Sequence, residues 1–121
     1  MAAKKIDPLQ GRAALVSCLN VDDAQSVDRR TWGTAVRYGL QELAACAPGR
    51  SVEVRVPPFG AVQMIEGTTH RRGTPPSVVE MPPAVFLALL SGRSNWESAI
   101  SSGQVQASGQ RCDLSPYLPL I

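Results

Sequence analysis

The sequence predicts an α+β fold in which a mainly antiparallel sheet of four or five strands is covered on one face by helices. Three observations support this class. Two amphipathic helical patterns precede residue 47, the hydrophobic period then changes from helical to alternating, and an apolar helix separates the later strands. With 121 residues, the chain has the length of one domain. We therefore expect residues 1–121 to form a single domain, with residues 1–6 as a flexible leader.

The first part of the chain is predicted to form two helices. Asp7 followed by Pro8 is a typical helix start, because Asp accepts from free N–H groups and Pro fits the first turn. Apolar residues then recur at helical spacing to about Leu19. A second helix begins after Asp28 and ends at Ala47-Pro48-Gly49. Its apolar stripe consists of Trp32, Ala35, Val36, Leu40 and Leu43.

The period changes to two in the segment SVEVRVP. Three valines, at positions 52, 54 and 56, are expected to face the core, and Glu53 and Arg55 are expected to face solvent. Pro57-Pro58 and Gly60 form a corner before a return strand at residues 61–66. A polar loop at residues 68–76 leads to a third strand at residues 77–81.

The last third contains an apolar helix that begins at Pro82-Pro83 and runs to Leu90, with Gly92 as its stop. Ser94 is expected to cap a short helix, with Glu97 completing a capping box. A strand at residues 104–107, a fifth segment at 110–114 and a helical turn after Ser115-Pro116 follow. The apolar helix needs partners on more than one side. It is therefore either ordinary core or the wall of a cavity.

Composition excludes several classes of function. A net charge of +2, scattered basic residues, and only two Tyr and two Phe argue against a nucleic-acid partner. No apolar region follows Lys4-Lys5, and the longest apolar run is shorter than the ~20 residues that span a bilayer. We expect a cytoplasmic protein without an integral membrane segment. The cysteines Cys18, Cys46 and Cys112 are odd in number and widely spaced, and are expected to be small buried hydrophobic residues.

Motifs for catalysis and metal binding are absent from the sequence. His70 is the only histidine and has no suitably spaced partners for a metal. Neither a G-x-S-x-G elbow nor a phosphate-binding loop occurs. We expect neither enzyme activity nor a cofactor. One polar cluster remains, which consists of the loop residues His70, Arg71 and Arg72 together with Arg55 from the first strand. Their donors could hold an anion or a lipid headgroup, although a solvated loop also explains them.

Two blocks resemble a known family: GRSVEVRVPPFGAVQMIEGTTHRRGTPPSVVE and VVEMPPAVFLALLSGRSNWESAISSGQVQASGQRCDLSPYLPLI. Together they run continuously from Gly49 to the C-terminus. The second block contains a helix ending in Gly-Arg, a short helix, Gly-x-Val-x-Ala-Ser-Gly, an acidic-Leu-Ser turn and a Leu-Pro-Leu end. These features are similar to the small bacterial, actinobacterial-type version of the sterol carrier protein fold.

The resemblance implies non-enzymatic binding or carrying of an apolar or amphipathic small molecule, of a lipid or fatty-acyl type, in a tunnel between sheet and helices. The C-terminal segment would form part of its wall or lid. Two alternatives remain open: an interaction or homodimerisation module with a filled tunnel, and an accessory domain of a separate enzyme. The implied apolar wall consists of Met64, Phe86, Leu87, Leu90, Trp96 and Leu118.

Overall fold

The computed structural model describes residues 5–21, 24–67, 77–109 and 113–121 of the chain. It confirms the α+β class, with four helices and a four-stranded sheet in these ranges. In chain order the elements are α1 (Pro8–Leu19), α2 (Arg29–Cys46), β1 (Val52–Val56), β2 (Gly60–Met64), β3 (Ser77–Glu80), α3 (Pro83–Ser91), α4 (Trp96–Ser101) and β4 (Gln106–Ser108). Short 3₁₀ turns occur at Ala24–Ser26 and Ser115–Tyr117.

The ends of the first two helices follow the predicted capping chemistry. The Asp7 carboxylate accepts a hydrogen bond from the Gln10 backbone N–H at 3.2 Å, with Pro8 in the first turn of α1. The Asp28 carboxylate accepts from the Thr31 N–H at 2.8 Å and caps α2. These bonds satisfy N–H groups that have no partner within the helix.

The cap of α4 differs from the prediction. Asn95 is the N-cap, and its side-chain oxygen accepts from the Ser98 N–H at 2.8 Å. The prediction of a capping box from Ser94 to Glu97 is therefore wrong, because the N-cap lies one residue later. Its physical reason lies in the preceding helix, because the Ser94 N–H donates to the Ala88 carbonyl at 3.1 Å and so completes the end of α3.

The sheet has the strand order β2-β1-β3-β4 and is mixed. β1 pairs with β2, and β3 with β4, in the antiparallel sense that the sequence predicts, whereas the central pair β1–β3 is parallel. Met64 at the end of β2 and Ser77 at the start of β3 both lie opposite Val52. The chain thus leaves β2 and enters β3 at one end of the sheet. Strand direction alternates along the chain from β1 to β2 to β3. In the sheet, however, β3 lies beside β1, on the side opposite to β2.

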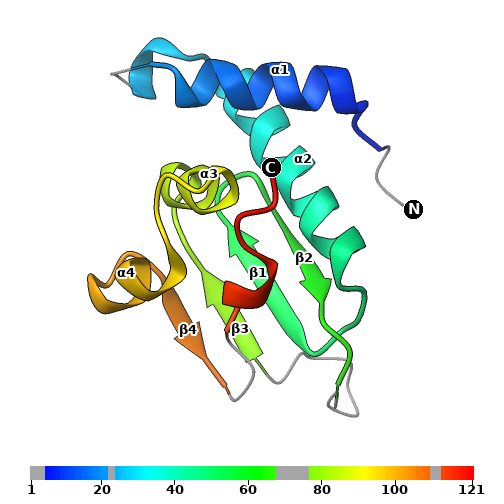
Figure 1. Ribbon diagram of the computed structural model, residues 1–121. Helices are drawn as coiled ribbons and strands as arrows, with labels where there is room; N and C mark the ends of the chain where they lie inside the picture. Colours follow the sequence, from blue (N-terminus) through cyan, green and yellow to red (C-terminus); the bar gives the residue numbers. More distant parts are fainter. Residues whose placement is uncertain (1–4, 22–23, 68–76, 110–112) are drawn as a thin grey trace.

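Helices cover one face of this sheet, with α2 and α3 over the strands and α1 lying across α2 (Figure 1). The predicted alternation of β1 is confirmed, because Val52, Val54 and Val56 are fully buried while Arg55 is exposed on the open face. The largest fully buried side chains beneath and within the helical layer include Tyr38, Leu43, Met64, Phe86, Leu87, Leu89 and Leu90.

Several predicted segments lie outside the described residues. They are residues 1–4 of the leader, the loop at 68–76 and residues 110–112 of the fifth segment. At residue 6 the chain is attached to α2: the Ile6 N–H donates to Gln41 Oε1 at 2.8 Å, and Gln41 Nε2 donates to the Ile6 carbonyl at 3.1 Å. The assignment of the whole chain to one domain stays a prediction.

Candidate functional site

Four of the six residues in the implied apolar wall lie in the interior between sheet and helices. Met64, Phe86, Leu87 and Leu90 are each at most 1% exposed. The contact between α2 and α3 is close at this point. A Cβ atom built on Gly39 would lie 2.4 Å from Leu90 Cδ1 and 2.9 Å from Phe86 Cε2. Where these helices meet, the protein's own side chains occupy the available space.

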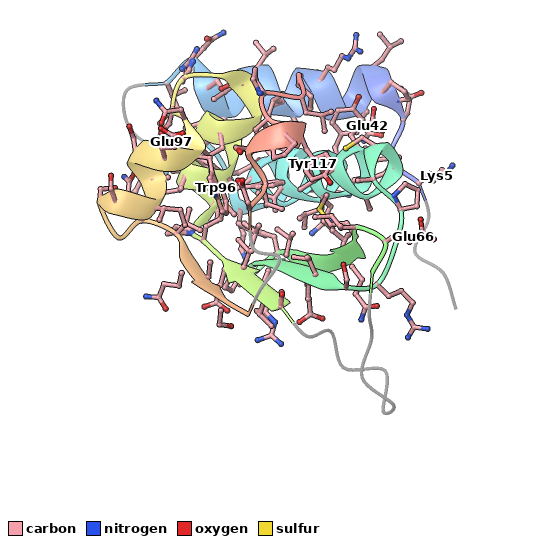
Figure 2. The ribbon with its side chains drawn as sticks, turned by 60° about the horizontal axis from the view of Figure 1, so that its bottom comes forward. Lys5, Glu42, Glu66, Trp96, Glu97 and Tyr117 are labelled. Carbon is pink, nitrogen blue, oxygen red and sulfur yellow. The ribbon has the colours of Figure 1, made fainter. Side chains whose placement is uncertain are left out.

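The other two wall residues, Trp96 and Leu118, come together at a surface hollow of about 390 Å³. The hollow lies between the α3–α4 connection and the C-terminal tail, which we define as residues 118–121. Trp96 is 8% exposed and Leu118 is half-buried. Figure 2 labels Trp96 on α4 and Tyr117 in the turn that precedes the tail. The full lining is Gly92, Ser94, Asn95, Trp96, Glu97, Ser115, Leu118 and Pro119.

The tail is held against the end of α3 by two backbone hydrogen bonds and by apolar packing of Leu118 and Leu120 against the core. The N–H groups of Leu120 and Ile121 both donate to the Leu90 carbonyl at 3.0 Å. That carbonyl lies in the last turn of α3, where helix carbonyls have no partner within the helix. Gly92 ends α3 with a φ of +82°, and a Cβ atom there would lie 3.5 Å from Pro119 Cβ. The end of α3 at Gly92 thus packs against Pro119 of the tail.

The hollow combines an apolar wall with a polar rim. Trp96, Leu118 and Pro119 provide apolar surface, while Ser94, Asn95 and Ser115 provide hydroxyl and amide groups. Glu97, which belongs to α4 (Figure 2), is the charged residue of the lining. Sequence reasoning did not include the rim residues. The turn sequences Gly92 to Asn95 and Ser115-Pro116 were visible signals, because connections of this kind often carry binding groups.

Arg55, one of the proposed headgroup residues, lies on the opposite face of the sheet from the apolar wall. Its Nε atom forms an ion pair with Glu53, and it stands opposite Ala61 and Glu80 on the neighbouring strands. It borders a shallow depression of about 370 Å³ with Pro57, Pro58 and Gly60. The structure therefore does not bring Arg55 together with Met64 or Phe86. His70, Arg71 and Arg72 lie outside the described residues.

The described cysteines differ in their surroundings. Cys18 is buried as predicted, and burial, with a smaller effect from the Asp28 carboxylate, raises the pKa of its thiol to about 11. Cys46 is exposed, contrary to the prediction, because it lies at the C-terminal end of α2; its thiol donates to the Leu43 carbonyl at 3.0 Å. Cys112 lies outside the described residues. Both described thiols are protonated at neutral pH.

Two observations concern the described ranges as a whole. Among these residues, no group of three or more His, Cys, Asp and Glu side chains is arranged to hold a metal ion. Nor does any helix there have both the length and the apolar character needed to cross a membrane.

Comparison with known proteins identifies the family. A search of curated proteins finds no match. The family model described as bacterial SCP ortholog matches residues 28–120, which include α2 and every later helix and strand. This match confirms the resemblance to small bacterial sterol carrier proteins, and α1 precedes the matched residues. The chain belongs to the bacterial SCP ortholog family.

Proposed function

We propose that the protein binds and carries an apolar or amphipathic small molecule, of a lipid or fatty-acyl type, without chemically altering it. The observation that carries the proposal is the shared position of Trp96 and Leu118 at the hollow beside the C-terminal tail. Family membership supports a carrier role in general. The ligand would lie against the indole ring, with its polar end among the hydroxyl and amide groups of the rim.

The dimensions and chemistry of this hollow suit such a ligand. Small-molecule sites usually measure about 300–1,000 Å³ and combine an apolar wall with a few polar groups, and this hollow measures about 390 Å³. Burial of alkyl surface contributes about 0.8 kcal/mol per methylene group. For the tail to move aside, the hydrogen bonds of Leu120 and Ile121 to the Leu90 carbonyl and the packing of Leu118 and Leu120 against the core would have to break. Displacing the tail would extend the hollow toward α3.

Binding of the neutral dye N-phenyl-1-naphthylamine tests this proposal. The unaltered protein should enhance dye fluorescence, and medium- or long-chain alcohols and fatty acids should displace the dye. Leu118→Asp should weaken dye binding about tenfold or more, because it places a carboxylate in the apolar wall. Leu9→Asp is the matched control, since Leu9 is 81% exposed on α1 and does not line the hollow. Equal loss in both variants, or no binding by the unaltered protein, would contradict the proposal.

A second candidate function is an interaction or homodimerisation module. The complete burial of Met64, Phe86, Leu87 and Leu90 favours it, because these residues then act as core and not as the wall of an open tunnel. Native mass spectrometry separates the two functions by reporting copy number and any co-purified lipid. A dimer without lipid that dissociates when residues 118–121 are deleted would favour this module. A monomer with bound lipid would favour the carrier.

A further inference from the structure

A second hollow, of about 340 Å³, lies between α2 and the edge strand β2. We call it the β2-edge hollow. The segment before α1 closes one side through the paired hydrogen bonds between Ile6 and Gln41. These bonds join residues that are 35 positions apart in the sequence. The lining consists of Lys5, Ile6, Arg37, Leu40, Gln41, Gly60, Ala61 and Val62.

The floor of the β2-edge hollow is apolar. Ile6, Leu40 and Val62 contribute aliphatic surface from three different segments. Gly60 lies directly beneath α2, since a Cβ atom built on it would be in van der Waals contact with Leu40 Cδ1 at 3.5 Å and with Arg37 Cγ at 3.7 Å. The aliphatic stem of Arg37 therefore lies above β2 and adds to the apolar lining. A hydrocarbon body of moderate size would be desolvated here.

The charged groups at this hollow are cations. Both charged lining residues, Lys5 and Arg37, are positive and exposed. The Arg37 guanidinium folds back along α2: a Cβ on Gly33 would lie 2.9 Å from Arg37 Nη1 and 3.2 Å from Phe59 Cδ1. Arg29 lies over the ring of Phe59, 5.8 Å from its centroid. Across the described ranges, none of these three cations takes part in an ion pair.

Carboxylates also lie on the same flank. Figure 2 shows Glu42 and Glu66 on the side of the molecule that carries Lys5, but neither is among the lining residues, and Glu42 accepts a hydrogen bond from the Tyr38 hydroxyl at 3.2 Å. Trp96 and Glu97 lie on the other flank in that view. The two hollows thus differ in charge as well as in place, since the hollow beside the tail has Glu97 at its edge and the β2-edge hollow has Lys5 and Arg37.

We infer that the β2-edge hollow binds a small amphipathic carboxylate, with its apolar body on Ile6, Leu40 and Val62 and its charged end at Arg37 or Lys5. A guanidinium can hold a carboxylate through two parallel hydrogen bonds. The apolar floor discriminates against strongly hydrated inorganic anions, because they would lose solvation without gaining contacts. The inference does not rest on the proposed carrier function, since it uses different residues on a different flank.

Nuclear magnetic resonance of the full chain, labelled with nitrogen-15, tests the inference with octanoate as the probe. Octanoate should shift the amide signals of Gln41, Ala61 and Val62 in a saturable manner. The uncharged analogue 1-octanol should bind this hollow about tenfold more weakly, because it makes no charge-assisted hydrogen bond. Arg37→Gln should weaken octanoate binding by a similar factor. Arg30→Gln is the matched control, as an exposed arginine on the same helix that borders another hollow.

Each alternative result overturns the inference. Octanoate could shift only the signals of Ser94 to Glu97, which would place the carboxylate in the hollow beside the tail and leave the carrier function intact. It could also bind no more tightly than 1-octanol, or shift no signals at all. Lys5→Gln is a second variant that should also weaken octanoate binding. Because Lys5 lies outside the helices and strands, this variant tests the inference even if Arg37→Gln folds poorly. If the unaltered protein bound octanoate at the β2-edge hollow but did not bind the dye, the carrier function would be contradicted and this inference would stand.

Discussion

The two sides of the helical layer differ in how completely they are packed. On the α2 side, Val36 and Leu43 are fully buried, as are the valines of β1. On the side of α4 and the tail, Leu118 is half-buried, and all three residues of β4 are exposed. Closely packed interiors leave few voids larger than a water molecule. A guest therefore finds room at the margins of the helical layer, beside the tail and at the edge strand β2, and not in the interior between α2, α3 and the sheet.

The largest effect is expected on the packed side. Phe86→Ala should lower the free energy of unfolding by about 3–5 kcal/mol, because it removes a large buried side chain and leaves a cavity; Phe86 is 1% exposed. Urea denaturation followed by circular dichroism measures the change. Val85→Ala, at the adjacent half-buried position, is the control and should cost clearly less. A loss below about 1 kcal/mol for Phe86→Ala would mean that this interior is not closely packed.

The two described cysteines differ in burial, and the pH dependence of unfolding tests that difference. The pKa of Cys18 is raised from 9.0 to about 11 in the folded protein, so above pH 9 the unfolded chain loses this proton first. The contribution of Cys18 is therefore complete below pH 9 and falls as pH rises toward 11. The full difference corresponds to roughly 2–3 kcal/mol. Urea denaturation at a series of pH values, compared with Cys18→Ala, isolates this contribution from other groups that titrate there.

Cys46 provides the matched control for this measurement, because it is exposed at the end of α2. Burial raises the pKa of the Cys46 thiol as well, so Cys46→Ala should reduce the pH dependence above pH 9 slightly, whereas Cys18→Ala should reduce it more. If the free energy of unfolding changes equally with pH in both variants, the burial of Cys18 does not stabilise the protonated thiol as expected.

The sequence predicts local structure well because the signals for it are local. Asp7-Pro8 and Asp28 mark helix starts, and Gly92 marks a helix end, since each supplies a hydrogen bond or a backbone angle within one turn. Strand direction was also predictable, because β1, β2 and β3 alternate. The order of the strands in the sheet was not predictable. Placing β3 beside β1 depends on how the chain passes the end of the sheet, and alternating hydrophobicity is the same for either order.

The candidate site was only partly predictable for a related reason. An apolar residue on a helix has the same pattern whether it fills the core or borders a hollow. Phe86 and Leu87 proved to be interior residues, whereas Trp96 and Leu118 lie at a surface hollow. The difference depends on which segments cover each residue. Arg55 illustrates the same limit, because the sequence shows its solvent-facing side but not that the apolar wall lies across the sheet.

The smallest effect is expected at the start of α4, on the loosely packed side. Asn95→Ala should lower the free energy of unfolding by about 1 kcal/mol, because it removes the oxygen that accepts from the Ser98 N–H. Ser94→Ala is the matched control and should have little effect, since the backbone N–H of Ser94, which the substitution retains, makes the contact with α3. Urea denaturation of both variants gives the difference. A larger loss for Ser94→Ala would restore the capping box that the sequence predicted. A loss for Asn95→Ala together with weaker dye binding would show that the helix start and the hollow are coupled, because Asn95 also lines that hollow.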